Sequence, residues 1–399
     1  MLRVVVAPDS FKGSLAAPDV CAAIARGITR AIPDVDVQLL PMADGGEGTL
    51  DAVLTAVGAA GRRETLAVRG AGAAPVEAAY GVLEQPQGLT AVIEVAQIVG
   101  ITDSNAMAVP VGDRSTWGVG ELIRALLDRG IRRFMIGLGG SSTNDGGSGM
   151  LAALGLALFD ATGEVIEPTP NGLASLARVD AATLDPRLAR CEVRIMSDVN
   201  NPLVGRAGAT AIFGPQKGVE PAQVQVFDQA LAHFASLAET AVGRSACQCP
   251  GAGAAGGLGF ALQLLGARFA SGAEVVAGLV GLDGALTNAD WVITGEGRSD
   301  AQTLLAKAPF VVAHHATMFN VPATLISGAV DPAALEALGE HFAGCFALPH
   351  GPSTLDDCIV NAALLLEQRA EQVARVYGAG WTRKKDPALT VQAAARTVA

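Results

Sequence analysis

The stretch MIGLGGSSTNDGGSGM, residues 135–150, passes from an apolar run into a dense patch of glycines, hydroxyls, an amide and a carboxylate. This change is typical of a buried strand that ends in a polar loop. The loop alone is compatible with a phosphate cradle, with a nucleophile site, or with a turn and nothing more. The pattern of the remaining chain has to decide among these interpretations.

The same change follows four other apolar runs, at 4–7, 38–43, 193–196 and 291–294. A single patch of this kind reads best as a turn or a helix cap. Five of them at the same end of one inferred sheet indicate a ligand site instead, because ligands of parallel sheets bind beyond the carboxyl ends of the strands. The polar residues placed there are Asp9, Ser10 and Lys12, then Asp44 and Glu47, then Ser141 to Asp145, then Ser197, Asp198, Asn200 and Asn201, then Glu296, Arg298 and Asp300.

Helical stretches rich in alanine and leucine separate these strands, as at 15–32 and 121–130. The alternation predicts βαβ units and a parallel sheet. The segment 60–90 differs, because it reads as short antiparallel strands joined by turns. We therefore expect an α/β protein in which a second domain of mixed type begins near residue 60.

The composition limits the partners of the chain. Its 399 residues are 50% hydrophobic and 17% charged, with a net charge of −11, which argues against nucleic acid as a partner. No apolar run reaches the roughly 18 residues of a membrane span. The N-terminus, MLRVVVAPDS, also lacks the pattern of a secretory signal. We expect a cytoplasmic protein with no membrane partner, whose anionic ligands are held by local groups or metal ions.

Two familiar phosphate-binding signatures are absent from the sequence. The chain contains neither G-x-x-x-x-G-K-[ST] nor H-R-D-x-x-x-x-N, which excludes Walker-type and protein-kinase-type sites. GAGAAG at 251–256 matches G-x-G-x-x-G, but it follows SACQCP instead of a buried strand, so we do not expect a dinucleotide there. We expect a flexible loop before a helix, placed so that it could lie over a nucleotide. The lack of a G-x-S-x-G elbow disfavours Ser141 as a nucleophile.

The chemistry of the five patches favours phosphoryl transfer. Glycines let backbone N–H groups approach an anion closely. Carboxylates beside those donors would repel a phosphate unless Mg²⁺ lies between them. Glycine-rich loops, carboxylates and a few cations are the groups that phosphoryl-transfer sites combine.

With these residues in view, the chain resembles the bacterial glycerate kinases of the type I family. The resemblance covers about residues 1–375 in order. The matching stretches are APDSFKGSL at 7–15, PMADGGEGT at 41–49, GLGGSSTNDGGSGML at 137–151, SDVNNPLVG at 197–205, FGPQKG at 213–218, GAGAAGGLG at 251–259 and TGEGRSDAQT at 294–303.

This resemblance implies a Rossmann-like parallel-sheet domain formed by both chain ends, with a second mixed α/β domain inserted between them and the active site in the cleft. On this chain we place the first domain at 1–60 and 285–378, the inserted domain at 61–284, and a weakly ordered tail at 379–399. The implied reaction is the ATP-dependent phosphorylation of D-glycerate with Mg²⁺, giving 2-phosphoglycerate.

Two departures from the family pattern bear on the site. Where the family commonly has Gly-Lys-x-Pro, this chain has Ala306 before Lys307 and Pro309, so a glycine that could admit a phosphate is replaced. The stretch EVAQIVGI at 94–101 also differs mildly, in a way that bears on substrate fit. Because the strand-end patches are intact, we expect activity to survive.

The candidate catalytic residues are Asp198, Lys12, Lys217 and Arg298. Asp198 is the first choice for the base or a Mg²⁺ ligand, and Asp44 and Glu47 are the second choice for Mg²⁺. Lys12 would hold a phosphate or the glycerate carboxylate, while Lys217 and Arg298 would stabilise developing negative charge. Residues expected to bind phosphate or substrate are Asp9, Ser10, Gly139, Gly140, Ser141, Ser142, Asn144, Asp145, Asn200, Glu296 and Asp300.

Several alternatives stay open at this point. The acceptor could be another small hydroxy acid, or the 3-hydroxyl of glycerate. A metal-dependent phosphatase and a nucleotide- or anion-binding regulator without turnover are functions of other classes. The sequence also leaves a monomer and a homodimer equally open.

Overall fold

The computed structural model describes residues 1–46 and 48–385, with side chains described as far as Trp381. The chain divides into two compact units. The first comprises Met1–Ala43, Asp51–Ala56 and the chain from Val276 on. The second comprises Asp44–Leu50 and Val57–Val275.

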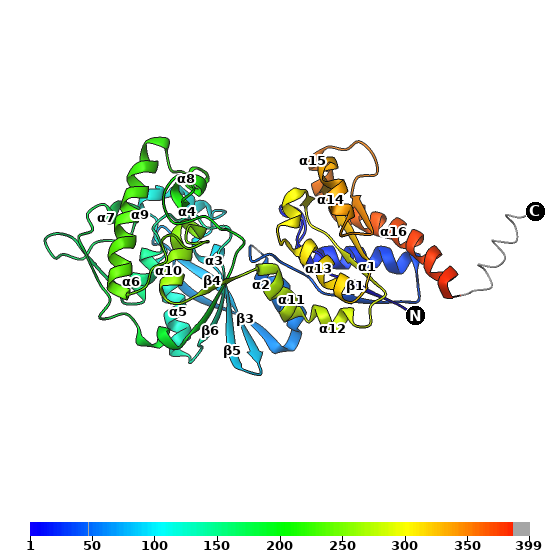
Figure 1. Ribbon diagram of the computed structural model, residues 1–399, viewed down its shortest axis with the longest axis horizontal. Helices are drawn as coiled ribbons and strands as arrows, with labels where there is room; N and C mark the ends of the chain where they lie inside the picture. Colours follow the sequence, from blue (N-terminus) through cyan, green and yellow to red (C-terminus); the bar gives the residue numbers. More distant parts are fainter. Residues whose placement is uncertain (47, 386–399) are drawn as a thin grey trace, which may run out of the picture. The chain divides into compact units, whose positions relative to one another are not determined.

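The first unit combines the N-terminal part of the chain, in blue, with a C-terminal part, in yellow to red (Figure 1). It is built on a parallel sheet with strand order β15-β13-β11-β1-β2. Both ends of the chain contribute to it, since β1 pairs with β2 on one side and with β11 on the other. Its strands are β1 (Leu2–Val6), β2 (Val35–Leu39), β11 (Trp291–Thr294), β13 (Ala323–Ser327) and β15 (Gly344–Ala347). A two-stranded pair, β12 (Arg298–Ser299) and β14 (Ala329–Val330), extends it beyond the strand ends.

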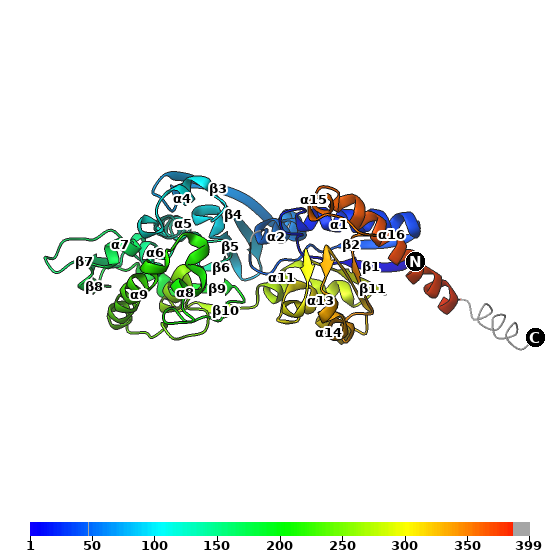
Figure 2. The same ribbon diagram turned by 90° about the horizontal axis from the view of Figure 1, so that it is seen from above.

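Helices cover both faces of this sheet, as α/β architecture requires when the strands are apolar on both sides. Figure 2 shows α1 and α16 side by side on one face and α13 on the other. The ring of Trp291 in β11 stacks on Tyr377 of α16 with 4.2 Å between centroids, which fixes α16 to the sheet. The helices are α1 (Ala17–Ala31), α2 (Thr49–Val57), α11 (Gly272–Val280), α12 (Leu282–Leu286), α13 (Ala308–Met318), α14 (Leu335–Gly339), α15 (Leu355–Val360) and α16 (Ala362–Lys385), of which α2 and α11 cross the boundary between the units.

The second unit is built on a mixed sheet with strand order β10-β9-β6-β5-β4-β3. Strands β3 to β5 form an antiparallel meander, while β5, β6, β9 and β10 run parallel. The strands are β3 (Gly61–Arg69), β4 (Pro75–Gln85), β5 (Gly88–Glu94), β6 (Arg133–Gly137), β9 (Glu192–Met196) and β10 (Arg268–Ala270), with a small separate pair, β7 (Ala157–Phe159) and β8 (Arg178–Asp180).

One large apolar core holds the second unit together. Helix α5 supplies Leu122, Ile123, Leu126 and Leu127 from one face, and these residues are buried, as their helical spacing predicts. The helices of this unit are α3 (Ala96–Val99), α4 (Ser104–Ala108), α5 (Trp117–Asp128), α6 (Ser148–Ala153), α7 (Pro170–Leu173), α8 (Ala209–Phe213), α9 (Pro221–Val242) and α10 (Leu258–Leu264).

The expected fold class is confirmed: a parallel-sheet unit contains both chain ends, and a second, mixed α/β unit is inserted between them. One expectation about the polar patches is wrong, because they do not follow strands of a single sheet. Three follow β1, β2 and β11, whereas two follow β6 and β9, which pair with each other in the other sheet. Of the predicted tail, residues 379–385 continue α16, and the rest lies outside the described residues.

Candidate functional site

The first residues of the glycine-rich loop after β6 form main-chain and side-chain hydrogen bonds with the chain that follows β5. The main-chain N–H and the hydroxyl of Ser142 both donate to the carbonyl of Val99, at 2.8 and 2.9 Å. The N–H of Ile101 donates to the carbonyl of Gly140 at 2.7 Å. The stretch 94–101, which the sequence singled out as unusual, therefore supports this loop directly.

Asp145 organises the middle of the loop. Its Oδ2 accepts hydrogen bonds from the N–H and the hydroxyl of Thr116, at 2.8 and 2.7 Å. The same carboxylate accepts from the N–H groups of Gly147 and Gly149, at 3.0 and 3.2 Å, at the start of α6. Burial raises the pKa of Asp145, and these hydrogen bonds oppose the rise. The structure thus shows Asp145 holding the loop in shape.

Three buried polar atoms of the loop have no hydrogen-bond partner among the described residues. They are Thr143 Oγ1, Asn144 Oδ1 and Ser148 Oγ. The other end of the Asn144 amide is engaged, because its Nδ2 donates to Thr210 Oγ1 at 3.0 Å. Buried polar atoms of this kind mark positions where water or a ligand group completes the bonding.

Lys217 lies at the end of the 3₁₀ helix η4 (Pro215–Lys217) and is only 2% exposed. Its Nζ donates to Ser141 Oγ at 3.0 Å and to the carbonyl of Thr143 at 2.8 Å. Burial, partly opposed by the charge of Asp145 and aided by that of Arg114, lowers the pKa of Lys217 to about 7. The amine is therefore shared between its charged and neutral forms near neutral pH.

Arg114 is a buried cation that the sequence analysis missed. It is 3% exposed, and its Nη1 donates to the carbonyls of Ser142 and Lys217 at 3.0 and 2.8 Å. It joins the glycine-rich loop to the segment that carries Lys217, although these lie far apart in the sequence. Burial lowers the pKa of Arg114.

The segment that follows β2 passes over the carboxyl ends of β6 and β9. A Cβ on Gly139 would lie 2.8 Å from the Cα of Gly46, and one on Gly45 would lie 2.6 Å from the carbonyl of Met196, so glycine is needed for this close approach. Asp44 is at the start of this segment and accepts a hydrogen bond from the N–H of Gly46 at 3.1 Å. Glu47 lies outside the described residues.

Asp198 and Asn200 follow β9 directly, and both are exposed. Because Gly45 contacts Met196, the chain segments that carry Asp44 and Asp198 meet at the end of β9. Within residues 1–46 and 48–385, no three His, Cys, Asp or Glu side chains form a group that could hold a metal ion. Mg²⁺ commonly takes only one or two protein carboxylates together with phosphate oxygens, so the carboxylates of Asp44 and Asp198 fit it by donor type.

The first unit carries the remaining candidates at the carboxyl ends of β1 and β11. Asp9 is 6% exposed and accepts a hydrogen bond from the N–H of Ser10 at 2.6 Å. The N–H of Asp9 donates to the carbonyl of Gly295, which joins these two strand ends. Lys12 is exposed, in the middle of the loop between β1 and α1.

Glu296 is the centre of a buried network at the end of β11. Its Oε1 accepts hydrogen bonds from Ser299 Oγ at 3.1 Å and from Thr303 Oγ1 at 2.6 Å. Its Oε2 pairs with Lys307 Nζ at 3.4 Å. Ser299 Oγ lies 2.8 Å from Ser327 Oγ, so the network extends to the end of β13. Both carboxylate oxygens of Glu296 thus position neighbouring side chains.

Ala306 and Arg298 lie in the same loop region. Ala306 has a φ of +62°, in the left-handed region that favours glycine, which gives a backbone reason for the glycine that resembling sequences have at this position. Arg298 has a 67% exposed side chain and pairs with Asp300 at 3.7 Å and with Asp331 at 3.5 Å. Asp300 also caps the 3₁₀ helix η6 (Ala301–Leu304).

The glycine-rich stretch 251–256 is not the open loop that the sequence suggested. Gly256 is buried, and a Cβ there would lie 2.0 Å from the carbonyl of Thr143. The N–H of Gly146 donates to the carbonyl of Gly256 at 2.9 Å. This stretch supports the loop after β6 from inside the fold.

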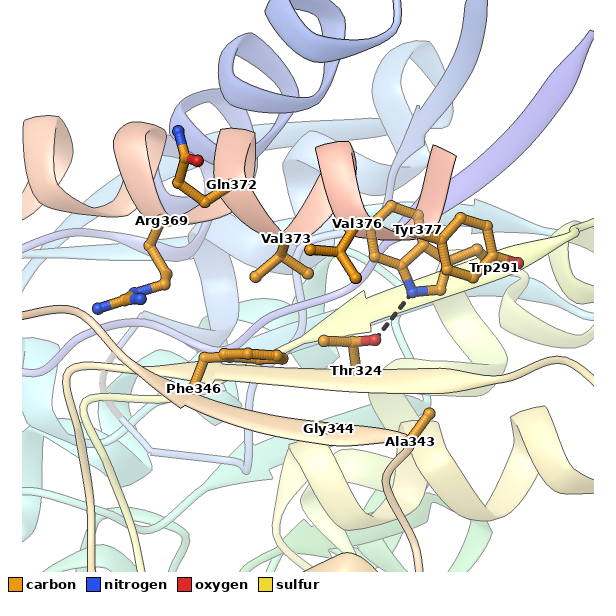
Figure 3. Close-up of a pocket in the computed structure, with 10 residues that line it drawn as sticks. All are labelled: Trp291, Thr324, Ala343, Gly344, Phe346, Arg369, Gln372, Val373, Val376 and Tyr377. Carbon is orange, nitrogen blue, oxygen red and sulfur yellow. Dashed lines mark hydrogen bonds between the residues drawn. The ribbon is translucent and has the colours of Figure 1, made fainter. Parts of the chain in front are cut away.

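A separate cavity of about 240 Å³ lies beneath α16 (Figure 3). Trp291, Thr324 and Gly344 line it, and these residues are near the amino ends of β11, β13 and β15. Ligands of parallel sheets bind at the opposite ends of the strands. The indole N–H of Trp291 is already used by Thr324 Oγ1, at 2.9 Å. This cavity is therefore not the candidate active site.

The sequence analysis missed four supporting residues besides Arg114. Thr116 has no distinctive local pattern, because its partner Asp145 lies on another segment, whereas Ser299 and Thr303 contact Glu296 within the matching stretch 294–303. Glu94 offered a signal, since it is a carboxylate at the end of an apolar strand. It is 3% exposed and accepts a hydrogen bond from the N–H of Leu50 at the start of α2, at 2.6 Å.

Comparisons with known proteins agree with one another. The model of the glycerate kinase family matches residues 4–378. A glycerate kinase from Bacillus subtilis (strain 168) is 41% identical, over 94% of this chain and 97% of the relative. A glycerate 2-kinase from Escherichia coli (strain K12) is 41% identical, over 82% and 86% of the two chains.

A solved structure supports the same assignment. The crystal structure of a protein described as glycerate kinase 2 from Salmonella typhimurium LT2 has a TM-score of 0.82 and 40% sequence identity. The similarity covers 96% of this chain and 99% of that one. Together, these matches and the strand-end loops show that the chain belongs to the glycerate kinase family, whose members are phosphotransferases with an alcohol group as acceptor.

Proposed function

We propose that the protein phosphorylates D-glycerate with ATP and Mg²⁺, and that the product is 2-phosphoglycerate. The observation that carries this proposal is the glycine-rich loop after β6, with the buried amine of Lys217 in contact with the hydroxyl of Ser141. The E. coli relative, named glycerate 2-kinase, supports the choice of the 2-hydroxyl.

In the second unit, we assign the loop to anion binding. The exposed Gly140 and the half-buried Gly139 would present main-chain N–H groups to a phosphate or to the glycerate carboxylate. Asn144, whose Oδ1 lacks a partner, is assigned to the same ligand. Asp145 and Ser142, whose side-chain oxygens are all engaged, are assigned to keeping the loop in place.

Mg²⁺ would be held by Asp44 and Asp198, with Glu47 as a further candidate. When bound, it would neutralise charge on the phosphate oxygens of ATP. Asp198 is also a candidate for the base, because it is exposed beside the end of β9. Asn200, two residues further on, is assigned to substrate binding.

In the first unit, we assign Lys12 and Ser10 to the triphosphate, and Asp9 to the same end of the sheet, where its carboxylate could meet the triphosphate only through Mg²⁺. We infer that Glu296 acts through its neighbours, since Ser299, Thr303 and Lys307 occupy its oxygens. Lys307, which the family motif retains, then becomes a further cation for a phosphate group. Arg298 and Asp300 stay candidates for the same region, although Arg298 is shared between two carboxylates.

Membrane association, location, oligomeric state and the identity of the acceptor are considered next to the proposed reaction. Among the described residues no helix is both long and apolar enough to cross a membrane. A cytoplasmic location and a monomeric or homodimeric state stay proposals. A kinase of another small hydroxy acid is the alternative function, because the same groups would serve any small anion that carries a hydroxyl.

The proposal is tested by measuring ADP formation with D-glycerate, L-glycerate, glycolate and lactate at equal concentrations, with and without excess chelator. We expect D-glycerate to have the highest kcat/KM and chelation to abolish turnover. A higher kcat/KM for another acid would replace the substrate. Release of inorganic phosphate without phosphorylation of any of the acids would point to a phosphatase. Binding of ATP without turnover would point to a regulator.

A further inference from the structure

The buried side chain of Lys217 has an unusual set of partners for a lysine. Its Nζ contacts one hydroxyl, Ser141 Oγ at 3.0 Å, and one carbonyl, that of Thr143 at 2.8 Å. Within the part of the chain that the structure describes, no carboxylate forms an ion pair with it. A lysine that served only as a buried cation would be expected to have such a carboxylate, because an unpaired buried charge is costly.

The charged groups that face Lys217 are Asp145 of the loop and Arg114 of the segment before α5. Arg114 contacts carbonyls and a thioether instead of a carboxylate, so it keeps a full positive charge near Lys217. Asp145 opposes that charge, but neutral donors already surround its oxygens. Burial of the amine is the main reason that the pKa of Lys217 lies near 7, while the charge of Asp145 opposes this shift and the charge of Arg114 adds a smaller contribution to it.

Ser141 connects this amine with the surface of the loop. It is the first hydroxyl after the exposed Gly140, at the end of β6 where ligands of parallel sheets bind. Both side chains are buried, with Ser141 5% exposed and Lys217 2% exposed. An isolated bridge between Ser141 and Gly100 fixes the backbone at this point.

We propose that Ser141 and Lys217 form a proton-accepting pair for the hydroxyl that receives the phosphoryl group. This inference rests on the proposed function and adds the identity of the base to it. As the acceptor oxygen attacks the γ-phosphorus of ATP, its proton passes to Ser141 Oγ while the Ser141 proton passes to the neutral amine of Lys217. The bond between the γ-phosphorus and the β–γ bridging oxygen breaks, and ADP leaves with that electron pair. Asp198 is then left to act as a metal ligand.

Neutral Lys217 satisfies the geometry of such a pair. A neutral amine donates two hydrogen bonds and accepts one, so it can donate to the carbonyl of Thr143 and accept from the hydroxyl of Ser141. A charged ammonium group only donates, and it would block the transfer. The pair therefore predicts activity that rises as the pH increases through about 7 and then levels off.

The test is kcat against pH, from 5.5 to 9.5, for the wild type and four variants with saturating ATP, Mg²⁺ and D-glycerate. Ser141→Ala should lower kcat about a hundredfold, since general base catalysis contributes about that much, with KM changed less than about threefold. Ser141→Thr keeps the hydroxyl and should recover most of the loss. Lys217→Met should be at least as slow as Ser141→Ala and should lack the rise near pH 7.

Ser175→Ala is the matched control, because it removes a serine hydroxyl that donates to a main-chain carbonyl, that of Gly172, outside the loop after β6. It should leave kcat and its pH profile close to the wild type. The proposal is overturned if Ser141→Ala stays within threefold of wild-type kcat, or if folded Lys217→Met keeps the rise near pH 7. Should Lys217→Met fail to fold, the two Ser141 variants decide. If the wild type does not turn over D-glycerate, the proposed function itself is contradicted. This outcome is distinct from a failure of the Ser141–Lys217 pair, in which the wild type stays active.

Discussion

The carboxylate of Asp145 accepts both the main-chain N–H and the hydroxyl of Thr116 through a single oxygen, Oδ2, at 2.8 and 2.7 Å. The two residues are 29 positions apart, and their contact ties the loop after β6 to the start of α5. Thr116 Oγ1 in turn accepts from the N–H of Met150 at 2.9 Å, in α6. This relationship holds the glycine-rich loop in the shape that the proposed ligand site requires.

Asp145→Asn should therefore destabilise the protein. The amide nitrogen of asparagine would face one of the N–H donors, so a buried donor loses its acceptor at a cost of about 1–3 kcal/mol. Denaturant unfolding measures the loss. Asp160→Asn is the matched control, since Asp160 makes similar turn contacts on the exposed surface, and its effect should be clearly smaller. Equal effects for the two variants would contradict the role assigned to Asp145.

Ala306→Gly should stabilise the protein by about 1 kcal/mol, because it removes the strain of a left-handed φ of +62° from a residue with a Cβ. Thermal unfolding measures this gain. Ala337→Gly, at an exposed position of helix α14, should have the opposite sign and lower stability by up to about 1 kcal/mol. We expect kcat/KM of Ala306→Gly to stay within about threefold of the wild type. A large rise in activity would show that Ala306 obstructs a ligand.

Glu296→Gln tests the network at the end of β11. The substitution removes the charge that faces Lys307 and places an N–H₂ group opposite one of its hydrogen-bonding neighbours. Misplacing Lys307 and Thr303 should lower kcat/KM for ATP about tenfold or more. Steady-state kinetics with varied ATP measures it. Unchanged kinetics would show that this network is only structural.

Asp198→Asn should reduce kcat by about a hundredfold, as expected for the loss of a base or a metal ligand. If Asp198 acts as a metal ligand, the concentration of Mg²⁺ needed for half-maximal activity should rise as well. Asp180→Asn, in the small β7–β8 pair, carries the same change without contact with the loop and should be close to the wild type. Near-normal turnover of Asp198→Asn would remove this residue from the site.

Glu64 predicts a pH-dependent contribution to stability in the antiparallel part of the second sheet. Its hydrogen bond from Arg129, with further ones from Arg62 and Tyr80, lowers the pKa of Glu64 to about 2. The stabilisation is complete above the ordinary pKa of about 4.5 and is lost as the pH falls toward 2. Glu64→Gln should thus be less stable than the wild type at pH 7, and the difference should shrink in acid. A difference that persists at pH 2 would refute this account.

The sequence predicted the structural features that depend on local pattern, such as strands and the loops that follow them. Apolar runs such as FMIG at 134–137 and the glycines that follow predicted a strand and its loop, because burial and turn chemistry act on neighbouring residues. The sequence could not show that β6 and β9 belong to a different sheet from β1, since strand pairing depends on long-range contacts.

The contacts of the supporting residues could not be predicted from the sequence for the same reason. Lys217 and Ser141 are 76 positions apart, and Arg114 and Lys217 are 103 apart. The resemblance pointed to Ala306 as a departure, but the reason, a left-handed backbone, is a property of the folded chain. Polar candidates whose oxygens proved to be engaged, such as Asp145, could not be told apart from ligand-binding ones by residue type.

The most direct test of the account is phosphorus NMR of the products formed from MgATP and D-glycerate. We expect the signal of 2-phosphoglycerate to appear together with that of ADP, at equal rates. A signal of 3-phosphoglycerate would correct the hydroxyl that is phosphorylated. If no phosphoglycerate forms, the central claim is contradicted, whether or not the enzyme phosphorylates another hydroxy acid.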